Sequence, residues 1–150
     1  MKKFWVGSIL LLASFSIVFC GTVPAALGTE GLQPMEQSQA FQDFLKKPAN
    51  NFSKLVCLLN YMRTAPVKVQ YEGIDYSIEV AYPVGLVYLM TNYKNENPEE
   101  WVRKNSYRSL FTNKIIYLKL PNGNYVPARD VLIEKFHELE AVRPGQPAKA

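Results

Sequence analysis

The sequence is poor in the residues on which most catalytic and metal sites depend. Its 150 residues include two cysteines and one histidine, His137. A hydrolytic triad needs a nucleophile, a histidine and an orienting carboxylate, and a zinc site needs several cysteine or histidine ligands at regular spacing. His137 sits beside Glu138 on a predicted helix, in a position that favours solvent. We therefore predict no metal, no cofactor and no catalytic residue.

The cysteine content and the charge bear on two further questions, disulfide bonding and nucleic-acid binding. If Cys20 is removed with an export signal, Cys57 is the only thiol left and no intramolecular disulfide can form. Cys57 is then expected to be a small buried hydrophobic residue. The formal charge is +4, from 17 basic and 13 acidic residues, and removal of Lys2 and Lys3 leaves 15 against 13, or +2. So small an excess does not favour a nucleic-acid partner.

The amino terminus is typical of an export signal. Two lysines follow Met1, and residues 4–19 are uncharged and apolar. We predict a signal peptide over residues 1–28, with cleavage after Ala25 or after Gly28, because a small residue precedes each cut.

Two other processing outcomes stay open. In one, the signal ends at residue 19 and Cys20 becomes the lipidated first residue of a bacterial lipoprotein. In the other, residues 4–19 stay in place as a membrane anchor, since the run is close to the roughly 17 to 25 residues that a spanning helix needs.

Two runs of alternating side chains mark the centre of the chain. Apolar and polar residues alternate from Val67 to Glu72 and again from Ile74 to Val80, with Gly73 between the runs. A period of two on both sides of a glycine predicts a β-hairpin with Glu72-Gly73 as its turn. A lone hairpin is marginal in water, so flanking helices are expected to cover its apolar face.

Local signals predict the remaining elements. They are a helix over residues 52–64 capped by Asn50 or Asn51, a helix with Pro83 in its first turn, a helix capped by Asn97, a second hairpin over residues 114–126 and a last helix from about Ala128.

The fold class that follows is α+β. We predict a small single domain in which two β-hairpins pack against three to four helices, preceded by a signal-peptide helix. Residues 29–50 contain Pro34 and Pro48 and are predicted to be a linker that can form a short helix. The domain then spans residues 51–142, and residues 143–150 are predicted to be a disordered tail, because they have too little apolar content to pack.

One polar stretch is a candidate ligand site. Asn105, Ser106, Arg108 and Ser109 follow the helix capped by Asn97, where the pattern would otherwise continue with apolar residues. Hydroxyls, an amide and a guanidinium could bind a carboxylate or a glycan. In the alternative interpretation, the same groups satisfy the last carbonyls of the helix and the turn that follows.

Four segments within residues 52–139 carry a resemblance to a known family. They are Val69–Tyr76, Tyr88–Lys94, Glu99–Ser106 and Ile116–Leu120. Together they resemble the YfeK-like family of small exported bacterial proteins, a domain of unknown function. The resemblance implies an envelope location and supplies no activity.

Individual residues both follow and depart from the pattern of that family. Ser106 and Ser109 match its serine-rich stretch and Tyr117 its tyrosine, which adds Tyr117 to the candidate ligand-binding residues. Tyr88 stands where the family has histidine, and Asn105 where an apolar residue is usual.

Three functions are consistent with the sequence. The leading hypothesis is a noncatalytic periplasmic or secreted module that binds another envelope protein, with membrane contact only through the signal or anchor segment. The second is a small hydrolase or glycan-binding protein that uses Ser106, Arg108 and Ser109. The third is a spacer domain tethered by residues 4–19 or by a lipid on Cys20.

Overall fold

Helices alternate with two hairpins along the chain. The computed structural model describes residues 29–142. Its elements are η1 (Met35–Gln37), α1 (Gln39–Leu45), α2 (Asn51–Thr64), β1 (Lys68–Tyr71), β2 (Ile74–Ser77), α3 (Ile78–Asn92), α4 (Pro98–Asn105), β3 (Tyr117–Lys119), β4 (Tyr125–Pro127) and α5 (Ala128–Ala141). The predicted α+β class with two hairpins is confirmed. The predicted signal peptide, the lipidation site Cys20 and the tail from residue 143 lie outside the described residues.

The two hairpins join into one antiparallel sheet with the strand order β2-β1-β3-β4. The first turn is Glu72-Gly73, as predicted, with φ of 54° at Glu72 and 85° at Gly73. Positive φ at both central residues is typical of a type I′ turn, whose twist matches that of the strands. The hairpins meet where Val69 of β1 pairs with Leu118 of β3. Each hairpin therefore protects an edge of the other.

The second strand is shorter than the alternating pattern predicts. β2 ends at Ser77, so the predicted continuation to Val80 is wrong. Ser77 pairs with Lys68, the first residue of β1. Just upstream the chain passes through Pro66, which has no N–H to extend the ladder. Without a partner strand, the next residues form helix instead.

The helix that follows begins earlier than expected. α3 starts at Ile78, which places Pro83 in its second turn and not at its start. Pro83 deprives the Glu79 carbonyl of the hydrogen bond that residue 83 would donate, but it fits the helical φ. The predicted position of Pro83 in the first turn is therefore wrong by about one turn.

Side-chain caps fix the starts of α2 and α4 where the sequence predicts them. The Asn50 side chain accepts a hydrogen bond from the Ser53 amide, and the Ser53 hydroxyl accepts one from the Asn50 amide, each at 2.8 Å. Asn97 accepts hydrogen bonds from the amides of Glu99 and Glu100 at the start of α4. These are the capping interactions that asparagine residues ahead of a helix predict.

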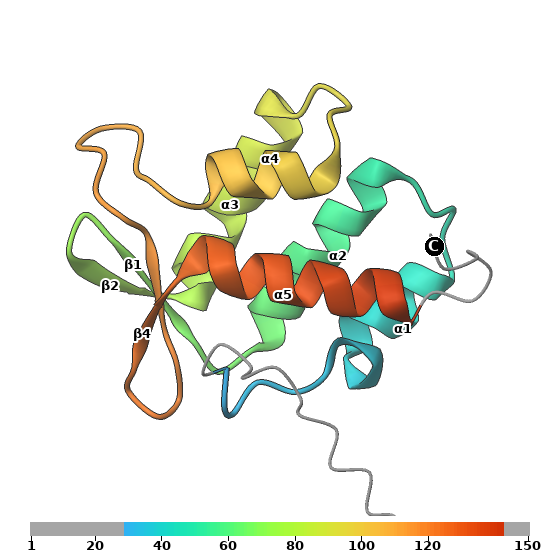
Figure 1. The fold of residues 1–150 in the computed structure, drawn as a ribbon, viewed down its shortest axis with the longest axis horizontal. Helices are drawn as coiled ribbons and strands as arrows, with labels where there is room; N and C mark the ends of the chain where they lie inside the picture. The colour runs from blue at the N-terminus through green and yellow to red at the C-terminus, as the bar shows by residue number, and fades with distance from the viewer. Residues whose placement is uncertain (1–28, 143–150) are drawn as a thin grey trace, which may run out of the picture.

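The sheet has an apolar face toward the helices and a polar face on the other side. The inner row includes Leu118, which is buried, and its neighbours Val69 and Val126. On the outer row Asp75 accepts hydrogen bonds from Tyr125 and Lys119 of the second hairpin. Figure 1 shows the sheet at one end of the molecule, with α5 leading away from β4 along the helical part.

The N-terminal strap, residues 29–38, packs with α1 onto the other helices, where the sequence predicted a linker. Met35 is fully buried, and Phe41 and Phe44 are each 5% exposed. The expected short helix is α1, which Ser38 caps by accepting a hydrogen bond from the Phe41 amide at 3.1 Å. The packed region therefore begins well before residue 51. Burial of the apolar residues between Pro34 and Pro48 thus outweighs the two prolines, on which the linker prediction was based.

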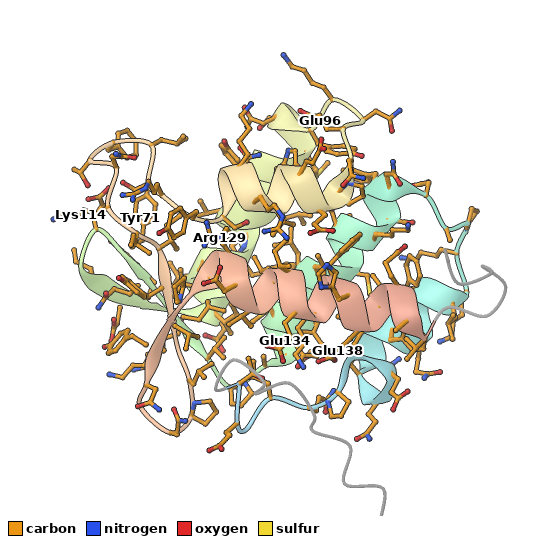
Figure 2. All side chains as sticks on the ribbon, viewed as in Figure 1. Tyr71, Glu96, Lys114, Arg129, Glu134 and Glu138 are labelled. Carbon is orange, nitrogen blue, oxygen red and sulfur yellow. The ribbon has the colours of Figure 1, made fainter. Side chains whose placement is uncertain are left out.

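Polar contacts with α5 hold the strap in place. The Met35 amide donates to Glu138 Oε2 at 2.7 Å. Lys135, only 3% exposed, donates to the Gln33 carbonyl at 3.2 Å and to Glu138 Oε1 at 2.8 Å. Figure 2 shows Glu138 on the side of α5 next to the strap. The cluster pairs these polar groups with one another, which is what their partial or complete burial requires.

Candidate functional site

An apolar groove of about 500 Å³ lies between α3, the sheet and the loop over residues 106–116. We call it the α3 groove. Its floor is the apolar face of the sheet, one wall is α3, and the other wall is the loop. Its lining residues are Val69, Tyr71, Tyr76, Val80, Ala81, Val84, Gly85, Tyr88, Asn105, Arg108, Leu110, Phe111 and Ile116.

The α3 wall exists because this helix is apolar on all sides. Ile78 and Leu89 face the core and are buried, whereas Val80 is 54% and Val84 68% exposed. A helix that is hydrophobic all round is usually enclosed by protein or lipid. Here one side of α3 has no protein cover among the described residues, so it presents an apolar surface to solvent.

The loop wall carries two large apolar side chains into solvent. Leu110 is 73% and Phe111 85% exposed. The loop that presents them is ordered by its own hydrogen bonds: the Ser109 amide donates to the Lys114 carbonyl at 2.8 Å, and the Ile116 amide donates to the Tyr107 carbonyl at 2.9 Å. The exposure of Leu110 and Phe111 is therefore a property of a defined turn.

Apart from the tyrosines of the sheet, the polar side chains of the groove come from α3, the end of α4 and the start of the loop. The Tyr88 hydroxyl donates to Asn105 Oδ1 at 3.0 Å, and Asn105 Nδ2 donates to the Trp101 carbonyl at 2.9 Å. Arg108 donates from Nη1 to the Asn113 carbonyl at 2.9 Å. It is the only lining residue whose side chain carries a full charge at neutral pH.

The structure separates the five residues that the sequence predicted as a ligand site. Asn105 and Arg108 line the α3 groove. Ser106 lines a smaller neighbouring pocket of about 160 Å³. Ser109 is 6% exposed, and its hydroxyl accepts a hydrogen bond from the Thr112 amide at 3.2 Å. Tyr117 lines neither pocket, because it pairs with Gln70 in the outward-facing row of the sheet.

These positions agree with the turn-stabilising interpretation for part of the stretch. Arg108 and Ser109 both bond to the backbone of the turn that they precede, and Asn105 bonds to a carbonyl of its own helix. The turn also holds Glu72, since hydrogen bonds from Ser109 and Thr112 lower the pKa of that carboxyl. Ser109 thus links the loop to the first hairpin and does not face the groove.

His137 lies away from the groove on α5. Its side chain is 59% exposed, as predicted, and its Nε2 lies 3.3 Å from Glu99 Oε2 on α4. Between residues 29 and 142, no three side chains of histidine, cysteine, aspartate or glutamate are grouped as a metal site would need. No helix in the same range is long and apolar enough to cross a membrane.

Sequence reasoning did not find the apolar walls of the groove. The available signal was an excess of apolar residues: residues 78–92 carry more of them than one buried face can use, and Leu110-Phe111 is an apolar pair within a turn-forming stretch. Either feature indicates exposed hydrophobic surface.

The chain matches no protein-family model, no curated protein and no solved structure. Its resemblance to the YfeK-like family stays a prediction.

Proposed function

We propose that this protein is an exported, noncatalytic binding module that holds a small apolar ligand in the α3 groove. The observation that carries the proposal is the exposure of Val84, Leu110 and Phe111 around a concave apolar surface. Ligand sites are typically concave, mostly apolar and about 300 to 1,000 Å³ in volume, and the groove has about 500 Å³. Exposed apolar patches of this kind mark binding surfaces.

The chemistry of the lining supports binding over catalysis. The guanidinium of Arg108 has N–H donors and no acceptor, so it can orient an anion but cannot act as a base or a nucleophile. Ser109, which a hydrolase would need in the open, is buried in the turn. Asn105 and Tyr88 bond to each other at 3.0 Å. The groove thus offers a concave apolar surface together with polar side chains that hydrogen bonds hold in place.

Export is proposed from the sequence of residues 1–28. A basic start and an apolar run favour passage across a membrane, and the three processing outcomes differ in mass. Mass spectrometry of the protein recovered from the producing cell distinguishes cleavage near residue 25 or 28, lipidation of Cys20 and retention of residues 4–19. The last two results would support a tethered module with the same groove.

A neutral fluorescent probe tests the groove. N-phenyl-1-naphthylamine brightens in apolar surroundings and has no charge, so its binding does not depend on Arg108. We expect saturable binding that Val84→Asp weakens by at least about 10-fold, because a carboxylate in an apolar site is costly to desolvate.

The matched control is Val87→Asp, on the same helix. Val87 is 60% exposed but does not line the groove, so this variant should bind the probe as the native chain does. Equal effects of the two substitutions, or no saturable binding by the native chain, would contradict the proposed function.

A further inference from the structure

We propose that the ligand of the α3 groove is a single-chain amphiphile with a carboxylate head, whose chain lies along α3 and whose head pairs with Arg108. This inference rests on the proposed function and names the class of ligand. It follows from the contrast between one cationic residue and an otherwise uncharged lining.

The guanidinium of Arg108 is oriented before any ligand binds. Nη1 donates to the Asn113 carbonyl at 2.9 Å, and the guanidinium carbon lies 5.0 Å from the centre of the Tyr107 ring. One of its five donors is used by the first contact, and the rest can serve a carboxylate, which a planar fork can bind through two oxygens.

No carboxylate between residues 29 and 142 forms an ion pair with Arg108. The nearby acidic residue is Glu72, and its carboxylate accepts hydrogen bonds from the Thr112 and Ser109 side chains. Lys114, in the same loop, adds a second positive charge close to Glu72. Figure 2 shows Lys114 and the groove residue Tyr71 at the same end of the molecule. This end of the groove is therefore complementary to an anion.

The rest of the groove suits a hydrocarbon chain. From Val80 to Tyr88 the α3 wall rises about 12 Å, at about 1.5 Å per residue, and its exposed members Val80 and Val84 have no polar atoms in their side chains. Leu110 and Phe111 face the chain from the other wall. Such a surface gains affinity from each methylene that it buries and does not reward hydroxyl-rich ligands.

A series of monomeric amphiphiles tests the inference on the protein purified from cells that express the full chain. Displacement of N-phenyl-1-naphthylamine is measured with octanoate, decanoate, dodecanoate, dodecanol and dodecyltrimethylammonium, each below its micellar concentration. We expect affinity to rise about 4-fold for each added methylene, dodecanoate to bind more tightly than dodecanol, and the cationic amphiphile to bind most weakly.

Substitution of Arg108 separates the head from the chain. Arg108→Gln should weaken dodecanoate by about 10-fold or more and leave dodecanol unchanged, since only the charge-assisted contact is lost. Arg103→Gln is the control, because Arg103 is an exposed arginine of α4 that pairs with Glu99 and does not line the groove. Added salt should weaken dodecanoate and not dodecanol. Circular dichroism confirms that each variant is folded.

The possible results separate the two proposals. If dodecanoate and dodecanol bind equally and Arg108→Gln changes neither, the carboxylate inference is overturned while the apolar groove stands. If neither the probe nor any amphiphile binds, both fail. Adsorption to phosphatidylglycerol vesicles without displacement by monomeric dodecanoate also overturns the inference, because the surface would then recognise a membrane.

Discussion

At the scale of single residues, Cys57 shows how burial alone can set reactivity. Its side chain is 2% exposed and its Sγ lies 3.5 Å from the Ala40 carbonyl oxygen. Burial raises the pKa of this thiol from 9.0 to about 12. The thiolate is the reactive form, so Cys57 is protected from oxidation and exchange while the chain is folded.

This shift predicts a loss of stability in base. The folded thiol keeps its proton above pH 9 while the unfolded thiol loses it, so ionisation favours the unfolded state between pH 9 and about 12. The free energy of unfolding should fall by up to about 1.4 kcal/mol per pH unit from this group. Denaturant titrations of Cys20→Ser and of Cys20→Ser/Cys57→Ala at several pH values measure this fall in the free energy of unfolding.

Comparison with the Cys57→Ala variant separates the contribution of the Cys57 thiol to the pH dependence from that of other ionisable groups. Burial also raises the pKa of Tyr61, and that residue is present in both proteins, so its contribution cancels in the difference. An identical pH slope for the two proteins would show that the Cys57 thiol reaches water in the native state.

Lys135 is predicted to control how firmly the N-terminal strap is held. Lys135→Met keeps most of the buried volume but removes the ion pair with Glu138 and the bond to the Gln33 carbonyl. The free energy of unfolding should fall by about 1.5 to 3 kcal/mol. The Met35 amide, which bonds to Glu138, should exchange its hydrogen faster.

Lys46→Met provides the comparison for that change. Lys46 forms an ion pair with Asp43, but its side chain is 70% exposed, so its loss should change stability by less than about 0.5 kcal/mol. A similar effect of the two substitutions, with no change in exchange at Met35, would mean that the buried contacts do not hold the strap.

At the scale of the elements, two glycines predict opposite responses to the same substitution. At Gly73 a new Cβ would meet no atom within 4 Å, but φ is +85°. Gly73→Ala should therefore destabilise the hairpin by about 1 to 2 kcal/mol. At Gly85, inside α3, the Cβ would lie 3.6 Å from Leu59, an ordinary contact.

Gly85→Ala should instead stabilise the protein by about 0.5 to 1 kcal/mol, the difference in helix propensity. Thermal or urea unfolding of the two variants tests both signs. A destabilised Gly85→Ala variant would indicate that α3 is distorted at this position, close to Pro83.

The elements that the sequence predicts correctly are those with local causes. Asn50, Asn97 and Glu72-Gly73 act on residues within one turn of the chain, so their effect can be predicted without knowledge of the fold. The end of β2 has a distant cause, because it depends on where β1 begins. The union of the two hairpins likewise depends on the pairing of Val69 with Leu118, about 50 positions away.

The candidate site was only partly predictable, because its walls also depend on contacts between segments that are distant in the sequence. Asn105 and Arg108 were found because polar residues interrupt an apolar pattern. Met90 is 64% exposed whereas its neighbour Leu89 is buried, and no sequence rule says which side of an all-apolar helix remains uncovered. The groove forms because the fold places α3 opposite Leu110. This arrangement of two distant segments cannot be predicted from either segment alone.

At the scale of the whole molecule, the strap and α1 belong to the folded unit. Met35, Phe41 and Phe44 are each at most 5% exposed. Burial of such side chains stabilises by about 1.5 to 3 kcal/mol each, so the three together supply roughly 5 to 9 kcal/mol, which is comparable with the total stability of a small domain.

Truncation tests this extent of the domain. A chain that begins at residue 29 should unfold cooperatively at the same temperature as the protein purified from cells that express the full chain, and a chain that begins at residue 47 should be largely unfolded at 25 °C. Circular dichroism and thermal melting measure both. Equal melting temperatures would restore the interpretation of residues 29–50 as a linker.

The open side of the α3 groove has a consequence for how long a molecule stays in it. Val84, Leu110 and Phe111 remain exposed along its rim, so a bound chain would keep one side in water and could leave sideways while every helix stayed in place. Residence would be brief and release would need no signal. A groove of this shape would therefore favour rapid exchange of its ligand with the surrounding solution over long retention.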